Sequence, residues 1–180
     1  MQEKKLRSLI PEFDWIQEQG LRQKTVHCWL DAMNRGGWSL EDLDRLPFTL
    51  LISDCPVSFR THVRSVTQMA AAAAKIFNEQ YPRGPVLNLD WVVSGGLLHD
   101  IGKLLEYKLE DGRFFKSENG RLLRHPFSGA ALAAGHDLPD AVVHIIATHA
   151  KEGDSGYRTP ESIIVHHADF MNFEPLKQLG

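Results

Sequence analysis

An apolar helical run that ends in His99-Asp100 constrains the fold of this chain more than any other feature. Residues 90–98 are apolar on most sides, which predicts a buried helix, and residues 95–103 read GGLLHDIGK. A carboxylate in so apolar a setting must be compensated by a cation or by a full set of hydrogen-bond donors. A plain ion pair with Lys103, one helical turn later, is the structural alternative. The run therefore predicts either a cation or a full set of hydrogen-bond donors beside Asp100, at the end of a buried helix.

Helical patterns dominate the chain after residue 54. Pro56, in a first helical turn, predicts a helix that runs to about residue 79. Proline or capping signals predict further helices over about 126–134, 139–150 and 160–172. Alternation around Asp111-Gly112 predicts a small β-hairpin over about 107–115. The expected fold class is an all-α helical bundle with a small β-hairpin insertion.

The first 50 residues differ in character from the rest. Gly20 and a break at 34–37 separate three expected helical segments, at about 11–19, 21–34 and 39–46. Because they carry no recognisable chemistry, we expect a structural N-terminal helical extension over 1–50, before a main domain over 51–180. The segment's three tryptophans are expected to dock it on the core or on a second subunit: Trp15, Trp29 and Trp38. A homodimer through these helices is therefore an open alternative.

Composition limits the class of protein. The 180 residues fit one domain with a short extension, and 43% hydrophobic and 24% charged residues are ordinary for a globular protein. A net charge of −3 argues against coating nucleic acid in general, though not against a local basic pocket for one phosphate. Cys28 and Cys55 are far apart and without metal-binding spacing, so reduced thiols are expected. With no apolar run of signal-peptide or membrane-spanning length, a cytoplasmic protein without membrane contact is expected.

Widely spaced residues form a candidate metal centre around the His-Asp pair. His144 lies about 140° around its helix from His149 and cannot face the same site, so it is left out. Taken alone, His62 could be a structural core histidine and His125 a polar cap. Each of the six residues has a possible structural explanation, but all six explanations would have to hold at the same time. We therefore expect a buried centre assembled from several helices, with the ligands His62, His99, Asp100, His125, His149 and Asp169.

The ordered pattern His…His-Asp…His…His…Asp over about residues 55–172 resembles the HD-domain superfamily of metal-dependent phosphohydrolases. The presence of His125 and His149 resembles its two-metal branch. The stretches 119–125 and 159–169 are similar to the HD module of bacterial 3′–5′ exoribonucleases and of relaxase-associated HD proteins. The chain departs from relatives that carry paired histidines at His149-Ala150, and it lacks the glycine-tyrosine-proline motif of the cyclic-di-GMP phosphodiesterases.

The resemblance implies a binuclear site in which Asp100 bridges both ions. One ion would take His62, His99, Asp100 and Asp169, and the other Asp100, His125 and His149. Such imidazole and carboxylate ligands suit two divalent iron, manganese, nickel or zinc ions better than calcium. A hydroxide bridging the ions would attack the phosphorus of a phosphodiester or phosphomonoester. The expected substrate is a small phosphorylated molecule, a nucleotide or short oligonucleotide.

Several residues near the ligands are assigned supporting roles. Besides Asp100, Lys103 is the expected catalytic residue, because its charge would neutralise the phosphate in the transition state. His166, on the same helix face as Asp169, is expected to support the ligands from behind. The further candidates for phosphate binding are Arg124, Lys151 and Arg158.

Two other functions remain open at this point. A branch of the same superfamily uses the same six ligands in mixed-valent di-iron oxygenases, although Lys103 and the exonuclease-like stretches favour hydrolysis. A non-catalytic nucleotide sensor, with the N-terminal helices signalling, is the third possibility. The complete ligand set argues against such a degenerate site.

Overall fold

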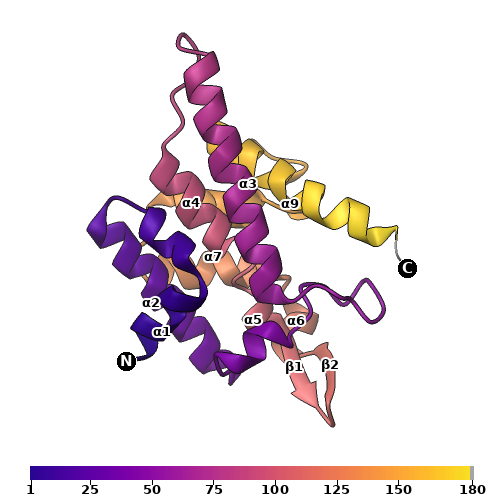
Figure 1. Cartoon of the computed structure of the whole chain (residues 1–180). Coiled ribbons are helices and arrows are strands. Elements are labelled where there is room, and N and C mark those ends of the chain that lie inside the picture. Colours follow the sequence, from indigo (N-terminus) through magenta and orange to yellow (C-terminus); the bar gives the residue numbers. More distant parts are fainter. Residues whose placement is uncertain (179–180) are drawn as a thin grey trace.

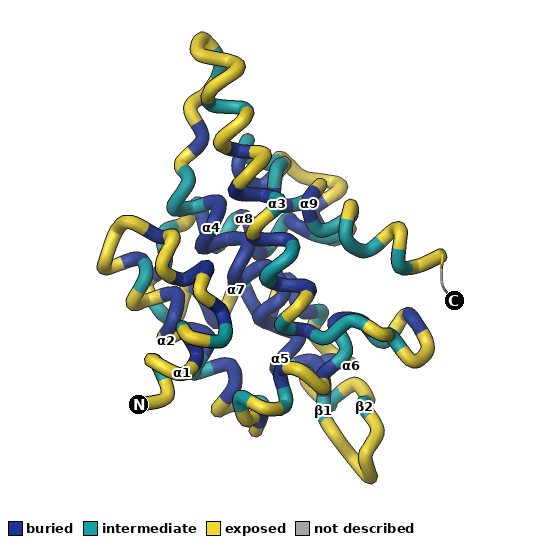
Figure 2. Tube along the Cα trace, in the orientation of Figure 1, coloured by how far each residue is buried: buried dark blue, intermediate teal, exposed yellow. Residues whose placement is uncertain are grey.

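A bundle of helices around α4 forms the structure, a computed structural model that describes residues 1–178 (Figure 1). α4 (Leu89–Leu98) packs against α3, α8 and α9, and α7 packs against α8. The bounds of these surrounding helices are α3 Phe59–Gln80, α7 His125–Gly135, α8 Asp140–Thr148 and α9 Pro160–Lys177. Figure 2 shows buried residues concentrated where these helices cross. The expected all-α bundle is confirmed, and the last two residues of the expected 51–180 domain lie outside the described part.

The starts of the main helices follow their capping residues. α3 begins at Phe59, because the Ser58 hydroxyl accepts a hydrogen bond from the Thr61 backbone N–H, so the expected start at Pro56 was wrong. Thr159 caps α9 in the same way, as the Thr-Pro sequence predicted. α9 continues to Lys177, beyond the expected end near residue 172. α8 ends at Thr148, two residues before its expected end.

The predicted hairpin is present. β1 (Tyr107–Glu110) and β2 (Arg113–Lys116) pair antiparallel, as a two-stranded sheet. Asp111 and Gly112 both have positive φ, at 48° and 74°, which the tight turn requires at both central positions. Two short helices that the sequence pattern did not predict flank the hairpin: α5 (Lys103–Glu106) and α6 (Glu118–Leu122).

The first 50 residues are helical but differ from the expected segments. α1 (Gln2–Leu9) was not predicted, and the segment expected over 11–19 is only a short 3-10 helix, η1 (Pro11–Trp15). Gly20 lies in the first turn of α2 (Gln19–Gly36) and does not break it, because the buried face of this helix outweighs the roughly 1 kcal/mol that a glycine costs. The segment expected over 39–46 contains only another 3-10 helix, η2 (Glu41–Asp44).

Two of the three tryptophans dock this extension on the bundle. The indole N–H of Trp29 donates to the Leu97 carbonyl at 2.9 Å, and that of Trp38 donates to the Leu104 carbonyl at 2.7 Å. Both side chains are buried, whereas Trp15 is 43% exposed. Apolar residues of α1, η1 and α2 belong to the same hydrophobic cluster as those of α4, α7 and α8. The extension is therefore packed as part of one core.

None of the helices in the described part of the chain is both long and apolar enough to cross a membrane.

Candidate metal centre

The six candidate ligands meet at the C-terminal end of α4. α3 contributes His62, the turn after α4 contributes His99 and Asp100, and α9 contributes Asp169. The start of α7 and the residue after α8 contribute His125 and His149. The side chains of all but Asp169 are at least 93% buried, and that of Asp169 is 15% exposed.

One group of donors lies around the Nε2 atom of His62. This atom is 3.2 Å from the His99 Nε2 atom, 3.3 Å from Asp100 Oδ2 and 3.1 Å from Asp169 Oδ1. A second group lies on the other side of Asp100, where the Nε2 atoms of His125 and His149 are 3.3 Å apart. They are 3.2 and 3.6 Å from Asp100 Oδ1.

The two oxygens of Asp100 therefore face different ligand groups. Oδ2 faces His62 and His99, and Oδ1 faces His125 and His149. Within each group, three residues have donor atoms within 4.8 Å of one another, close enough to hold one metal ion. These three-residue groups contain the residues that the sequence resemblance assigned to separate ions.

Hydrogen bonds at the far side of the imidazole rings leave lone pairs directed at the centre. The Nδ1 atoms of His99 and His149 are each 2.7 Å from a backbone carbonyl, of Gly96 and Ile146. A carbonyl can only accept, so Nδ1 carries the proton and Nε2 of the neutral ring carries a lone pair. His125 Nδ1 is 3.1 Å from a carboxylate oxygen and has the same tautomer. The lone pairs of these three imidazoles thus point toward the carboxylates of the centre, a donor set that fits divalent transition-metal ions.

Burial and charge keep His125 and Asp100 in the forms that metals bind. Burial lowers the pKa of His125 to about 4, so its imidazole is neutral near pH 7. Burial acts to raise the pKa of Asp100, but the neighbouring positive charge of Lys103 outweighs it and holds the pKa well below its usual range. Burial also acts to lower the pKa of Lys103, and the charge of Asp100 reverses this to raise it to about 12. Asp100 and Lys103 are therefore a charged pair.

A close approach of α7 places His125 beside Asp100. A side chain at Gly102 would bring its Cβ atom within 2.1 Å of the His125 carbonyl oxygen, so only glycine permits this packing. The close approach of the second ligand group therefore explains why residue 102 of the GGLLHDIGK stretch is a glycine.

Glu106 contacts a candidate ligand but was not among the residues predicted from the sequence. Its carboxylate accepts hydrogen bonds from the backbone N–H of His125 at 2.8 Å and from Nδ1 at 3.1 Å, and it is paired with Arg124 and Lys116. Burial acts to raise its pKa, but the hydrogen bonds and charge of His125, and then the charge of Arg124, outweigh it and lower the pKa to about 2. The available signal was a carboxylate one helical turn after Lys103, beside two leucines.

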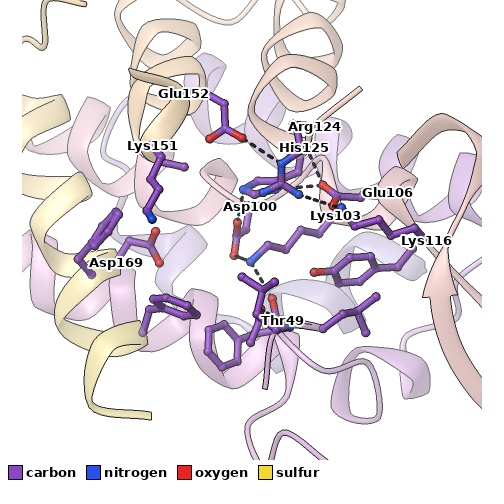
Figure 3. Close-up of a pocket in the computed structure, with 17 residues that line it drawn as sticks. Thr49, Asp100, Lys103, Glu106, Lys116, Arg124, His125, Lys151, Glu152 and Asp169 are labelled. Atoms are coloured by element: carbon purple, nitrogen blue, oxygen red, sulfur yellow. Dashed lines mark hydrogen bonds and ion pairs between the residues drawn. The ribbon is translucent and has the colours of Figure 1, made fainter. Parts of the chain in front are cut away.

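A cavity of about 370 Å³ opens over the centre (Figure 3). Asp100, His125 and Asp169 line its floor. Phe48, which lies in the segment treated as purely structural, also lines it, and its ring stacks on His62 with centroids 4.3 Å apart. The sequence gives no periodic signal for this contact, because residues 45–58 lie outside the long helices and strands.

Lys103, Arg124 and Lys151 line the cavity, as a phosphate-binding role requires. The Lys103 ammonium donates to Asp100 Oδ2 at 2.6 Å and to the Phe48 carbonyl at 2.7 Å. The ion pair considered as the structural alternative is thus present, yet the lysine is buried at the cavity wall and does not point into bulk solvent.

Two other predicted residues lie elsewhere. Arg158 does not line the cavity; its guanidinium donates to the carbonyls of Thr148 and Ala150, which holds the turn after α8. His166, which was expected to support the ligands from behind, does not line the cavity, and its Nδ1 atom is 2.5 Å from the carbonyl oxygen of the candidate ligand His149. His166 therefore braces the backbone of the second ligand group.

Two kinds of known protein have sequences similar to part of this chain. A "Dihydroneopterin 2',3'-cyclic phosphate phosphodiesterase" of Methanocaldococcus jannaschii is 38% identical over 112 residues, which are 60% of this chain and 43% of that protein. "Ribonuclease Y" of Thermotoga petrophila is 33% identical over 86 residues, 48% of this chain and 14% of the relative. "Ribonuclease Y" of Pseudothermotoga lettingae is 30% identical over 111 residues, 62% and 18% of the two chains. The matched parts thus make up less than half the length of these relatives.

No solved structure matches the chain significantly. The sequence model of the HD domain family matches residues 59–171, which contain every ligand of the two groups and exclude the N-terminal extension. The match covers more than half of the chain and agrees with the resemblance inferred from the ligand pattern. The chain belongs to the HD domain family.

Proposed function

We propose that this protein is a metal-dependent phosphodiesterase that cleaves a small, nucleotide-like phosphodiester at a binuclear centre. The position of Asp100 between two complete ligand groups carries the proposal, because a shared carboxylate is what a pair of closely spaced ions needs. The family membership and the phosphodiesterase relative support the same reaction class.

The cavity supports a small substrate. A volume of about 370 Å³ lies in the range of small-molecule sites and is too small for a folded RNA. Cationic side chains at its wall offer contacts for phosphate oxygens, and aromatic rings offer contacts for a base. A mononucleotide or the end of a short oligonucleotide combines these chemical features. A cyclic phosphodiester is our first candidate, by analogy with the name of the methanogen relative.

The protein's own groups have separable tasks in this reaction. When bound, the metal ions would supply a water of lowered pKa and polarise a phosphoryl oxygen. Asp100 holds both ligand groups together, and the Lys103 charge keeps its carboxylate ionised. An ammonium has three donors, and Asp100 and Phe48 take two of those of Lys103. The third is left for a phosphoryl oxygen, where it stabilises the charge that develops in the transition state.

Arg124 and Lys151 would add further contacts to the phosphate. Arg124 is fixed by Glu106 and Glu152, with N–O distances of 2.7 and 3.0 Å, so it presents a positioned charge. Figure 3 shows the Lys151 side chain directed toward Asp169. Both residues line the cavity, and we assign them to substrate binding.

The test is an anaerobic assay of the purified protein loaded with Mn²⁺ or Fe²⁺. Bis(p-nitrophenyl) phosphate and 2′,3′-cyclic nucleotides are the substrates, and Asp100→Ala is the inactive variant. Glu79→Ala is the matched control, because Glu79 is an exposed acid on α3 that belongs to neither ligand group. We expect metal-dependent hydrolysis by the wild type and the control, and none above background by Asp100→Ala.

Two alternative results would point to another function. Protein that holds two iron ions but consumes oxygen together with its substrate, without hydrolysing any phosphodiester, would indicate a di-iron oxygenase. Saturable nucleotide binding without turnover under either metal would indicate a sensor. Either result would contradict the proposed phosphodiesterase.

A further inference from the structure

The cavity above the metal centre has two chemically different walls. One is charged and is built by residues from α5, β2 and the segments around α7 and η3 (Lys151–Gly153): Glu106, Lys116, Arg124, Lys151 and Glu152. The other is apolar and is built by the segment after η2 and by α9: Phe48, Leu50, Leu51, Phe170 and Phe173. The candidate metal ligands form the floor between these walls, so a bound substrate must present a different chemical group to each.

α9 connects the metal centre to the apolar wall. Phe173 follows Asp169 by four residues, which places both on one face of the helix, about 6 Å apart along its axis. Phe48 contacts Phe173 edge-on, with ring centroids 6.2 Å apart and an interplanar angle of 76°. Phe48 is almost fully buried, but Phe173 is only partly buried and lines the cavity. Phe173 thus has ring surface available beside the reacting phosphate.

Resting on the proposed phosphodiesterase function, we propose that Phe173, together with Phe170, is a stacking wall that selects phosphodiesters carrying an aromatic heterocycle. The phosphate lies over the metal centre, and the heterocycle stacks on the side of α9. Phe173 touches only the remote part of the substrate, so it determines specificity and takes no part in the bond cleavage.

The composition of the walls favours this class of substrate over other phosphodiesters. A nucleobase or a similar heterocycle has an apolar face and a polar edge, and the two walls match these two features. A lipid tail would cover the apolar wall but offer no polar group to the charged wall, and a plain polyol phosphate would leave the aromatic wall uncovered. The volume of about 370 Å³ favours a single heterocycle over a stack of several bases.

The experiment compares two cyclic phosphodiesters that differ in the heterocycle. Adenosine 2′,3′-cyclic phosphate carries a base, and glycerol 1,2-cyclic phosphate carries none. We expect Phe173→Ala to lower kcat/KM for the adenosine compound by roughly 5- to 150-fold, mainly through KM, as the loss of one base-stacking contact implies. Activity toward the glycerol compound is expected to stay within about 2-fold, because that compound makes no stacking contact.

Two further variants separate recognition from folding. Phe173→Leu keeps an apolar side chain without a π face, so it should fold and still lose part of the preference for the adenosine compound. Met171→Ala is the matched control, since Met171 is 60% exposed on the same helix and does not line the cavity. Metal content is measured in each variant to show that the centre is intact.

The outcomes are distinguishable. An equal loss for both substrates in Phe173→Ala and Phe173→Leu, or no loss for either, would overturn the stacking wall while leaving the phosphodiesterase in place. Wild-type protein that holds two ions and hydrolyses neither compound would overturn the proposed function itself, and the stacking wall with it. A loss confined to the adenosine compound would support both.

Discussion

The two ligand groups of the metal centre share Asp100, and each has one imidazole held by a backbone carbonyl, His99 and His149, but the other imidazole of each group is held by a different interaction. In the second group, His125 is fixed by Glu106, and His149 by the carbonyl of Ile146. In the first group, His62 Nδ1 is a buried atom that has no hydrogen-bond partner among residues 1–178. Its ring is held by stacking on Phe48, with an interplanar angle of 25°.

This difference separates what orients a ligand from what makes it basic. A carboxylate behind an imidazole fixes the tautomer and also strengthens the ring as a donor, whereas an aromatic neighbour only restricts its orientation. We therefore expect the ion held by His125 to depend on charge behind the ring. The ion held by His62 should depend on packing and on the two carboxylates that it faces, those of Asp100 and Asp169.

Removing one imidazole from each group gives the largest expected effect that separates them. His62→Ala and His125→Ala should each lose one ion and retain the other, because Asp100 and the remaining ligands still serve one group. Hydrolysis should fall by more than about 100-fold in both, a larger loss than the removal of an outer partner causes.

Metal analysis after exhaustive dialysis checks this prediction, with His144→Ala as the control. His144 accepts a hydrogen bond from the Thr159 backbone and belongs to neither group. Loss of both ions from either ligand variant would show that the groups do not bind separately.

Some parts of the two ligand groups could be predicted from the sequence, and others could not. The meeting of the six candidate ligands was predictable because each belongs to a motif or to a helix face with a clear inward direction, as with His62 and Asp169. The buried helix before His99 was equally predictable from its apolar run. Both features can be recognised from the types of residue within a short stretch of the sequence.

The supporting residues were harder to predict because tertiary contacts alone assign their roles. Glu106 is recognisable only once α7 has brought His125 to it, and Phe48 only once its irregular segment has folded over α3. Arg158 looked equivalent to Arg124 in sequence, but its guanidinium is used by backbone carbonyls. The N-terminal helices were misplaced because short amphipathic segments and 3-10 turns have similar patterns.

Replacing the carboxylate behind His125 should have a smaller effect, confined to the second ion. In Glu106→Gln the amide cannot accept at both oxygen positions, so it cannot satisfy His125 together with Arg124 and Lys116. We expect the affinity for one ion to fall by about 10- to 100-fold, with the other unchanged. Titration with Mn²⁺ measures both affinities.

Glu152→Gln is the control for this substitution, because Glu152 also pairs with Arg124 but is not hydrogen-bonded to His125. Equal weakening of one ion in both variants would assign the effect to Arg124 and would contradict a role for Glu106 in orienting the imidazole.

Changing the aromatic neighbour of His62 should have the smallest effect, and on the opposite ion. Phe48→Leu keeps an apolar side chain in the core but removes the stacked ring, so we expect the first ion to bind about 2- to 10-fold more weakly, as the loss of one aromatic contact implies. The free energy of unfolding should fall by about 1.5 kcal/mol or less. Mn²⁺ titration and urea unfolding measure the two quantities.

A uniform weakening of both ions would instead mean that Phe48 supports the whole centre, through the bond between its carbonyl and Lys103, which the substitution leaves chemically intact. Only weakening that is confined to the first ion would show that packing does for His62 what Glu106 does for His125.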